Sequence, residues 1–123
     1  MTRIIIGIAM DVHRKIGPGF QERIYHRAMA VALEKSDIDF ESEKEFVVIF
    51  EKRKVGTFRV DLFVAGRVIV ELKAVTGEMP PLFQTQTISY LKASNLEVGL
   101  LLNFGNRSLE IKRLARYHNF QSV

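Results

Sequence analysis

The sequence contains no cysteine among its 123 residues. Without cysteine the chain cannot form disulfides, hold zinc through thiolates or use a cysteine nucleophile, so any metal would need oxygen or imidazole ligands. Such ligands favour magnesium or manganese. Internal repeats, low-complexity tracts and linkers are also missing. We therefore expect residues 1–123 to form one domain, which is long enough to bury a core without covalent staples.

No hydrophobic run is long enough to cross a membrane. The apolar run Ile4–Ile6 is soon interrupted by Asp11 and by the basic residues that follow it. This interruption argues against a signal peptide and a membrane span, and we expect a cytoplasmic protein with no membrane partner. Positive charge is in mild excess, with a formal net charge of +4. That excess suits a polyanionic partner such as nucleic acid without requiring one.

Apolar residues at helical spacing predict three helices. The first covers residues 3–16 and ends at Gly17-Pro18-Gly19, and the second runs from about residue 20 to residue 35. The third, from about residue 82 to residue 94, follows a loop that contains Gly77 and two prolines.

The other apolar segments predict strands. Residues 40–50 contain alternating apolar side chains, and the chain then turns at Lys52-Arg53-Lys54 into a hairpin, which gives three consecutive strands. The apolar run over 98–104 suits a strand buried on both faces, and residues 108–114 form either a final edge strand or a short helix. The order ααβββαβ(β) predicts an α/β or α+β fold with a central mixed sheet flanked by helices.

The most informative pattern lies between Arg59 and Lys73, where side chains are sorted by odd and even position. Because successive side chains on a strand point to opposite faces, this segment predicts a hairpin with one aliphatic face and one charged face. The charged face carries Asp61 and Glu71 together with Arg59 and Lys73. The aliphatic positions are Val60, Leu62, Val64, Val68, Val70 and Leu72.

The two carboxylates share a face only if the loop between the strands has an odd number of residues. A three-residue loop over 64–66 meets this condition, with Gly66 in the left-handed position of a bulge. In that register Asp61 lies opposite Ile69 and diagonal to Glu71, about 7–8 Å away, so that one cation could bridge the two acids. The alternative is a set of solvated charges on the open side of an antiparallel pair.

Asp61 followed by the triplet Glu71-Leu72-Lys73 resembles the PD-(D/E)XK nuclease superfamily, in which an acid on one strand and an acid-any-lysine triplet on the next form the metal site. The resemblance implies a restriction-endonuclease-like core. It also implies Mg²⁺ or Mn²⁺ held by Asp61, Glu71 and the Leu72 carbonyl, with Lys73 as a catalytic residue.

A longer set of residues resembles the GxxExxY family, a small PD-(D/E)XK-like branch largely described as predicted nucleases of undefined substrate. It starts at Gly19-x-x-Glu22-x-x-Tyr25. Glu22 then resembles the helical acid that supplements the metal site in related exonucleases; the alternative is an acid that complements the helix dipole beside a packing tyrosine. The other matching segments are Val12-His13, Arg59-Val-Asp61, Val70–Val75, Tyr90–Ala93 and Val98–Gly105.

Three further features carry weaker signals. Gln86 and Tyr90 lie four residues apart on one helix face and resemble the Gln-x-x-x-Tyr element of RecB-like nucleases, where they could orient Lys73 or a phosphate. The alternative is a rim glutamine and a tyrosine that caps the core. His13 is more often structural than a site residue in such a position. The basic residues that could contact a nucleic-acid backbone are Arg107, Lys112, Arg113 and Arg116.

From these patterns we predict a nuclease that hydrolyses phosphodiester bonds, with DNA favoured over RNA, through a metal-activated water. Its site residues would be Asp61, Glu71, Lys73, Glu22, Gln86 and Tyr90. The competing hypothesis is a non-catalytic module that binds nucleic acid or a protein, and a third is an enzyme that hydrolyses a small phosphorylated or nucleotide-like ligand. A homodimer is possible under each.

Overall fold

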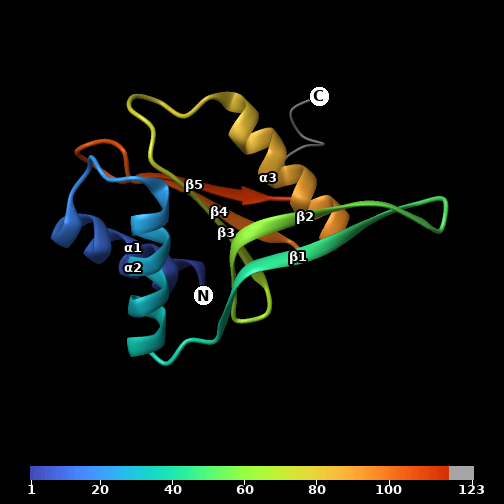
Figure 1. The fold of residues 1–123 in the computed structure, drawn as a ribbon, viewed down its shortest axis with the longest axis horizontal. Coiled ribbons are helices and arrows are strands. Elements are labelled where there is room, and N and C mark those ends of the chain that lie inside the picture. Colours follow the sequence, from blue (N-terminus) through green and yellow to red (C-terminus); the bar gives the residue numbers. More distant parts are fainter. Residues whose placement is uncertain (117–123) are drawn as a thin grey trace.

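In the computed structural model, which describes residues 1–116, a five-stranded sheet separates helices on its two faces (Figure 1). The strand order follows the chain, and only β3 and β4 run parallel, so the sheet is mixed as predicted. The strands are β1 (Phe40–Phe50), β2 (Arg53–Val64), β3 (Val68–Lys73), β4 (Val98–Asn103) and β5 (Glu110–Ala115).

The three helices divide between the two faces of the sheet. α1 (Thr2–Ile16) and α2 (Glu22–Lys35) pack on one face, where their buried residues share a core with alternate residues of β2 and β3. α3 (Pro81–Ser94) packs on the other face with a second, smaller core (Figure 1). The observed order ααβββαββ confirms the prediction and shows that the last element is an edge strand. No helix among residues 1–116 is long and apolar enough to span a bilayer.

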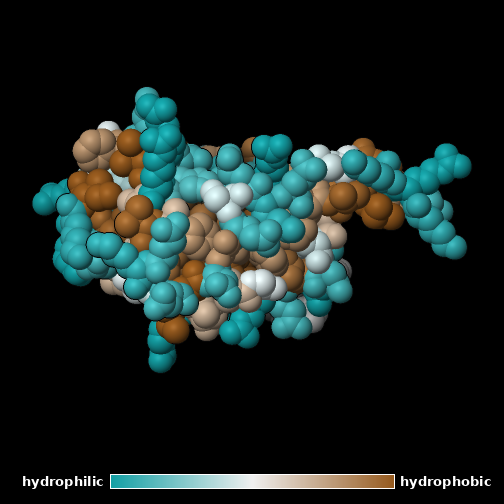
Figure 2. Space-filling model, turned by 60° about the horizontal axis from the view of Figure 1, so that its bottom comes forward, coloured by the Kyte–Doolittle hydropathy of each residue, from teal (hydrophilic) through white to brown (hydrophobic). Residues whose placement is uncertain are grey.

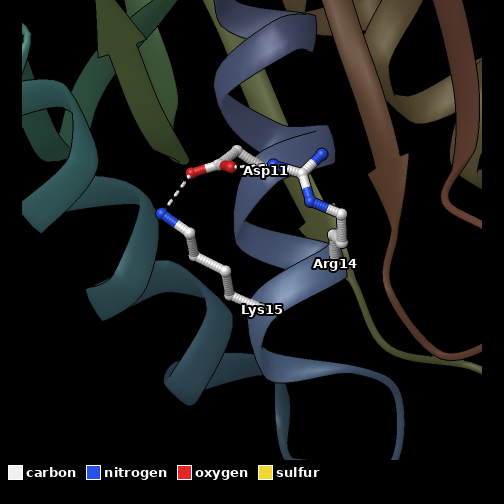
Figure 3. A network of polar contacts seen from close by, with 3 residues as sticks. All are labelled: Asp11, Arg14 and Lys15. Carbon is white, nitrogen blue, oxygen red and sulfur yellow. Dashed lines mark hydrogen bonds and ion pairs between the residues drawn. The ribbon is translucent and has the colours of Figure 1, made fainter.

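The exposed face of α1 carries a small charged network away from the two cores (Figure 3). Asp11 pairs with Arg14 and, at 3.0 Å, with Lys15. The hydrogen bond from Lys15 is the main reason that the pKa of Asp11 is lowered. Exposed pairs of this kind contribute little to stability, and we assign the network no functional role.

The hairpin between β2 and β3 has a different register from the predicted one. Its three-residue loop covers 65–67, not 64–66, and both Ala65 and Gly66 have positive φ, at 54° and 66°. The pairs Leu62↔Val70 and Phe63↔Ile69 follow from this turn. Extending the register by one residue places Asp61 across from Glu71, so the predicted diagonal arrangement is wrong. The odd loop length, and with it the shared face, is confirmed.

The predicted aliphatic face is interrupted at Val60. Leu62 packs in the core beneath α1 and α2, whereas Val60 packs in the core beneath α3. Val60 and Leu62 thus point to opposite faces of the sheet, although strict alternation would put them on the same face. The alternation shifts by one residue at Asp61. At the same place the pairing of β1 with β2 skips Glu43, whose φ is 52°. The left-handed Glu43 interrupts the ladder opposite Asp61 without inserting an extra residue, since the register is the same on both sides, and strict parity fails at this break.

Candidate metal centre

Asp61 and Glu71 meet where β2 and β3 separate. The paired segment of these strands ends at Leu62↔Val70, after which β2 stays paired with β1 and β3 with β4. Beyond this point, carboxylate side chains accept the hydrogen bonds of two backbone amides. Glu71 Oε2 accepts a hydrogen bond from the Asp61 N–H at 3.0 Å, and Asp61 Oδ2 accepts one from the Leu72 N–H at 2.7 Å. The backbone thus holds the two carboxylates at one spot.

Glu71 is the most perturbed acid among the described residues. The residue is only 7% exposed. Burial is the main cause that raises its pKa to about 9, and the neighbouring charge of Asp61 raises it further, against a smaller opposing effect of Lys73. A carboxyl group in this setting is protonated near neutral pH unless a cation offsets the charge. The site therefore favours a positively charged ligand.

This shift predicts how stability depends on pH in the absence of metal. The pKa of Glu71 in the folded chain lies near 9, above the ordinary value of 4.5. Between these values the unfolded chain loses the proton while the folded chain keeps it, so the free energy of unfolding should fall as pH rises, by at most about 1.4 kcal/mol per pH unit. Urea unfolding in EDTA across this range should show the slope, and Glu71→Gln should flatten it. Equal slopes for the two proteins would contradict the assignment.

Lys73 completes the charged group on β3. It follows Glu71 by two residues, so both side chains point to the same face of the strand. Its Nζ lies 4.4 Å from the centroid of the Phe83 ring on α3. This cation–π contact holds the ammonium beside the acids and away from full solvation.

Glu22 reaches the same region from the other helical layer. It is the first residue of α2, where the helix dipole favours a carboxylate. Desolvation is the largest cause that raises its pKa, and Asp61 raises it as well, whereas Lys73 and His26 lower it. Glu22 thus lies within electrostatic range of both Asp61 and Lys73. The gap between β2 and β3 lets groups from opposite layers converge.

Tyr90 borders the acids from α3, whereas Gln86 makes no measured contact with them. Burial raises the pKa of the Tyr90 hydroxyl, and the charges of Glu71 and Asp61 raise it further. Its ring stacks on Phe58 with 4.3 Å between centroids. Gln86 lies one turn earlier and is exposed. Among residues 1–116 no hydrogen bond is found for its amide, so its role stays a prediction.

The available donors suit a hard divalent cation. Asp61 and Glu71 offer carboxylate oxygens, and the Leu72 carbonyl lies on the backbone between Glu71 and Lys73. Mg²⁺ and Mn²⁺ prefer such oxygen ligands, and Mg²⁺ keeps several waters rather than a complete protein cage. Within the described part of the chain, no three histidine, cysteine, aspartate or glutamate side chains lie close enough to form a ligand set. The pair, supplemented by water and substrate oxygens, fits this preference.

Two asparagines that the sequence reasoning missed hold the loop after β3. Asn103 Oδ1 accepts the Val75 N–H at 2.9 Å, and its Nδ2 donates to the Val75 carbonyl at 2.9 Å. Asn106 binds Gly77 in the same two-way manner, at 2.8 Å for each bond. Together they fix the chain as it leaves Lys73 for α3. The only sequence signal was polar residues directly after a buried strand.

Gly105 lies between these asparagines against the same loop. A Cβ atom there would be 2.2 Å from the Val75 carbonyl oxygen. Gly105→Ala should therefore lower the free energy of unfolding by roughly 2 kcal/mol or more, because backbone has to move. Gly7→Ala is the control, since a Cβ at Gly7 meets nothing within 4 Å and alanine favours the helix by about 1 kcal/mol. Chemical denaturation checks both, and equal stabilities for Gly105→Ala and the parent would contradict the close approach.

Two other sequence candidates lie outside the site. His13 Nε2 donates to the Asn106 carbonyl at 2.8 Å, and the residue is only 7% exposed, so it supports the loop after β4. Arg59, predicted on the charged face, is exposed and pairs with Glu45 at 3.6 Å. The slip in alternation at Asp61 accounts for its different direction.

The predicted basic cluster near the end of the chain is dispersed. Arg107 lies in the loop before β5. Lys112 and Arg113 are adjacent on β5 and so point to opposite faces of the sheet. Arg116 donates a hydrogen bond to the Asn95 side chain. Nucleic-acid contact by these residues stays a prediction.

Comparison with known proteins agrees with the fold. Residues 1–114 match the sequence model of the PD-(D/E)XK nuclease superfamily. No curated protein matches the sequence. Among solved structures, the crystal structure of SSO0001 is similar with a TM-score of 0.62 at 18% identity, covering 76% of this chain and 50% of that one. The chain thus spans half the length of SSO0001, and at this identity the likeness shows the fold alone.

Proposed function

The chain belongs to the PD-(D/E)XK nuclease superfamily, and from this membership and the site geometry we propose that it is a Mg²⁺- or Mn²⁺-dependent nuclease. The observation that carries the proposal is the carboxylate pair Asp61 and Glu71, held by backbone hydrogen bonds beside Lys73. The end of the β2–β3 pairing beside these two carboxylates supports the proposal. We further propose DNA as the favoured substrate and GxxExxY as the branch to which the chain belongs.

Each side chain has a separate task in this proposal. Asp61, Glu71 and the Leu72 carbonyl hold the cation, and Glu22 supplies an additional acid from α2. A bound divalent ion would lower the pKa of a water and offset charge that develops on the phosphate. Lys73 orients the water or stabilises the transition state electrostatically.

Tyr90 and Gln86 are proposed to position the substrate. The phenol of Tyr90 lies within electrostatic range of both acids, and its stacking on Phe58 fixes the ring. A hydroxyl group so placed can donate a hydrogen bond to a phosphate oxygen. Gln86, one helical turn earlier, would contact the phosphate chain beside it.

The test is metal-dependent cleavage by the whole chain. Plasmid, single-stranded, branched and RNA substrates are incubated with Mg²⁺, with Mn²⁺ and with EDTA. We expect cleavage with either metal and none with EDTA, and calorimetry should show Mn²⁺ uptake. A preparation of Asp61→Asn controls for contaminating nuclease. No cleavage of any substrate, together with no uptake of Mn²⁺, would favour a non-catalytic binding module and overturn the proposal.

A further inference from the structure

The β1–β2 hairpin extends beyond the body of the molecule (Figure 1). β1 and β2 have 11 and 12 residues, whereas β3, β4 and β5 have six each. The outer part, residues 47–55, is here called the arm. Figure 2 shows it as a projection with hydrophobic surface along its length and hydrophilic side chains at its end.

The arm exposes apolar side chains that the rest of residues 1–116 does not cover. Val47 and Ile49 are 43% and 59% exposed, and Phe50 and Val55 are 66% and 61% exposed. The register of β1 with β2 shifts between Val48 and Ile49, so the ladder is irregular within the arm. Several exposed apolar side chains on one projecting ribbon are typical of a surface that binds a partner.

The end of the arm is positively charged. Lys52, Arg53 and Lys54 are all exposed, against the single carboxylate of Glu51. No ion pair involves these three cations among residues 1–116. Closer to the body, by contrast, the lysine and arginine of the same hairpin pair with glutamates. The three cations are thus available to a partner.

The turn that presents these cations is conformationally costly. Glu51 and Lys52 have φ values of 51° and 64°. Two successive left-handed residues suit asparagine and glycine, and each other residue type costs roughly 1 kcal/mol there. Such strain often accompanies a functional constraint. Both residues of this turn are charged and exposed.

The distance from the arm to Asp61 is set by β2, because this strand contains both residues 53–55 of the arm and Asp61. Seven residues separate Lys54 from Asp61 along one strand, which at about 3.3 Å per residue is roughly 23 Å. A nucleic-acid strand advances about 3.4 Å per nucleotide, so the same length spans about seven base pairs. A duplex bound at the acids would reach the arm if it continued about seven base pairs in that direction.

We propose that the arm binds the substrate duplex about seven base pairs from the scissile phosphate, an inference that rests on the proposed nuclease function. Lys52, Arg53 and Lys54 contact phosphates, and Phe50 lies against the sugars and bases of the groove. A two-stranded ribbon fits the major groove of a duplex, and both faces of this ribbon are free to be enclosed. The positive charge of the arm favours nucleic acid as its partner. In a dimer formed through two arms, the three cations of one arm would repel the three of the other.

The experiment compares two triple variants of equal charge. Lys52→Ala/Arg53→Ala/Lys54→Ala removes the cations of the arm, and Arg3→Ala/Lys35→Ala/Arg67→Ala removes three exposed cations from elsewhere. Fluorescence anisotropy in EDTA measures binding to a labelled DNA duplex of about 5 base pairs, closed by a hairpin loop and shorter than the separation of the two sites, and to a labelled duplex of about 24 base pairs. Each phosphate contact is worth about eightfold at about 0.1 M salt. We therefore expect the arm variant to bind the long duplex up to about 500-fold more weakly, with a salt slope smaller by about 2 to 3.

Three controls distinguish a contact made by the arm from a general loss of positive charge. They are the short duplex, the control variant and a further substitution at Phe50. The short duplex cannot span both sites, so the arm variant should lose much less affinity for it, and the control variant should resemble the parent on both lengths. Phe50→Ser should weaken long-duplex binding severalfold and leave the salt slope unchanged, because it removes no charge. Thermal unfolding verifies that each variant is folded.

The outcomes separate the arm from the nuclease proposal. If the parent and the arm variant bind the long duplex with equal affinity, the proposal that the arm binds the duplex is wrong. This holds even if both proteins cleave the short duplex in Mg²⁺. If duplex binding depends on the arm but neither the parent nor any variant cleaves DNA, the arm proposal is supported and the nuclease proposal is overturned. Preference for single strands over duplex, or a parent dimer that Phe50→Ser converts to monomer, overturns duplex binding by the arm.

Discussion

Asp61→Asn is expected to abolish Mn²⁺ uptake and to lower the rate of phosphodiester cleavage by roughly a thousandfold or more, since several kcal/mol of transition-state stabilisation depends on the ion. The substitution keeps shape and removes charge. The new amide oxygen can still accept the Leu72 N–H, which Asp61 Oδ2 accepts at 2.7 Å. The fold should therefore persist. Calorimetric titration with Mn²⁺ and cleavage of a labelled duplex measure the two losses.

The matched control is Asp39→Asn, which removes a carboxylate from the exposed loop before β1. It should leave metal uptake and cleavage unchanged. A second readout comes from Glu71, whose raised pKa depends partly on the Asp61 charge. In Asp61→Asn the metal-free protein should lose less stability between pH 5 and pH 9 than the parent does. Retention of full metal uptake by Asp61→Asn would remove the acid pair from the mechanism.

Lys73→Ala is expected to spare metal uptake and to lower turnover roughly 100- to 1000-fold, the usual cost of losing one electrostatic contact to the transition state. The ammonium lies over the Phe83 ring, on the same strand face as Glu71. In the proposed mechanism the lysine acts through its charge and its position. Single-turnover cleavage at saturating Mn²⁺, with calorimetry on the same sample, separates the effect on chemistry from the effect on binding.

Lys44→Ala is the control for the loss of a lysine that lies over an aromatic ring. Lys44 Nζ is 5.9 Å from the centroid of the Phe46 ring, but it projects from β1 and not from β3. A general loss of packing would slow both variants alike. If Lys73→Ala cleaves as fast as the parent, the lysine has no part in the reaction. A loss of Mn²⁺ uptake in Lys73→Ala would instead make it a structural support of the acids.

The sequence predicted the elements and the convergence of the acids because both depend on local periodicity. Alternation placed Asp61 and Glu71 on one face for any odd loop, and the loop has three residues. It did not predict the register, because Ala65 adopts a positive φ that its residue type does not signal. Nor did it predict the slip at Val60, which coincides with a left-handed Glu43 on a different strand. Cross-strand irregularities of this kind have no local pattern.

The supports of the site were the least predictable from the sequence. Asn103 and Asn106 bind backbone groups 26 to 29 residues away in the chain. Such bonds depend on how β4 aligns with β3, which composition and spacing do not specify. Tyr90 was predicted from its distance to Gln86, yet its position beside the acids depends on stacking with Phe58 from β2.

Where β2 and β3 separate, carboxylate oxygens accept hydrogen bonds from two backbone amides. These two amides can report on the state of the candidate metal centre. The backbone amides of Asp61 and Leu72 donate to carboxylate oxygens, those of Glu71 and Asp61 respectively. Any event that changes the charge on those oxygens, whether proton loss or arrival of an ion, should shift the NMR resonances of these two amides and alter their exchange with deuterium. Occupancy of the centre can thus be followed in solution, residue by residue, without a substrate.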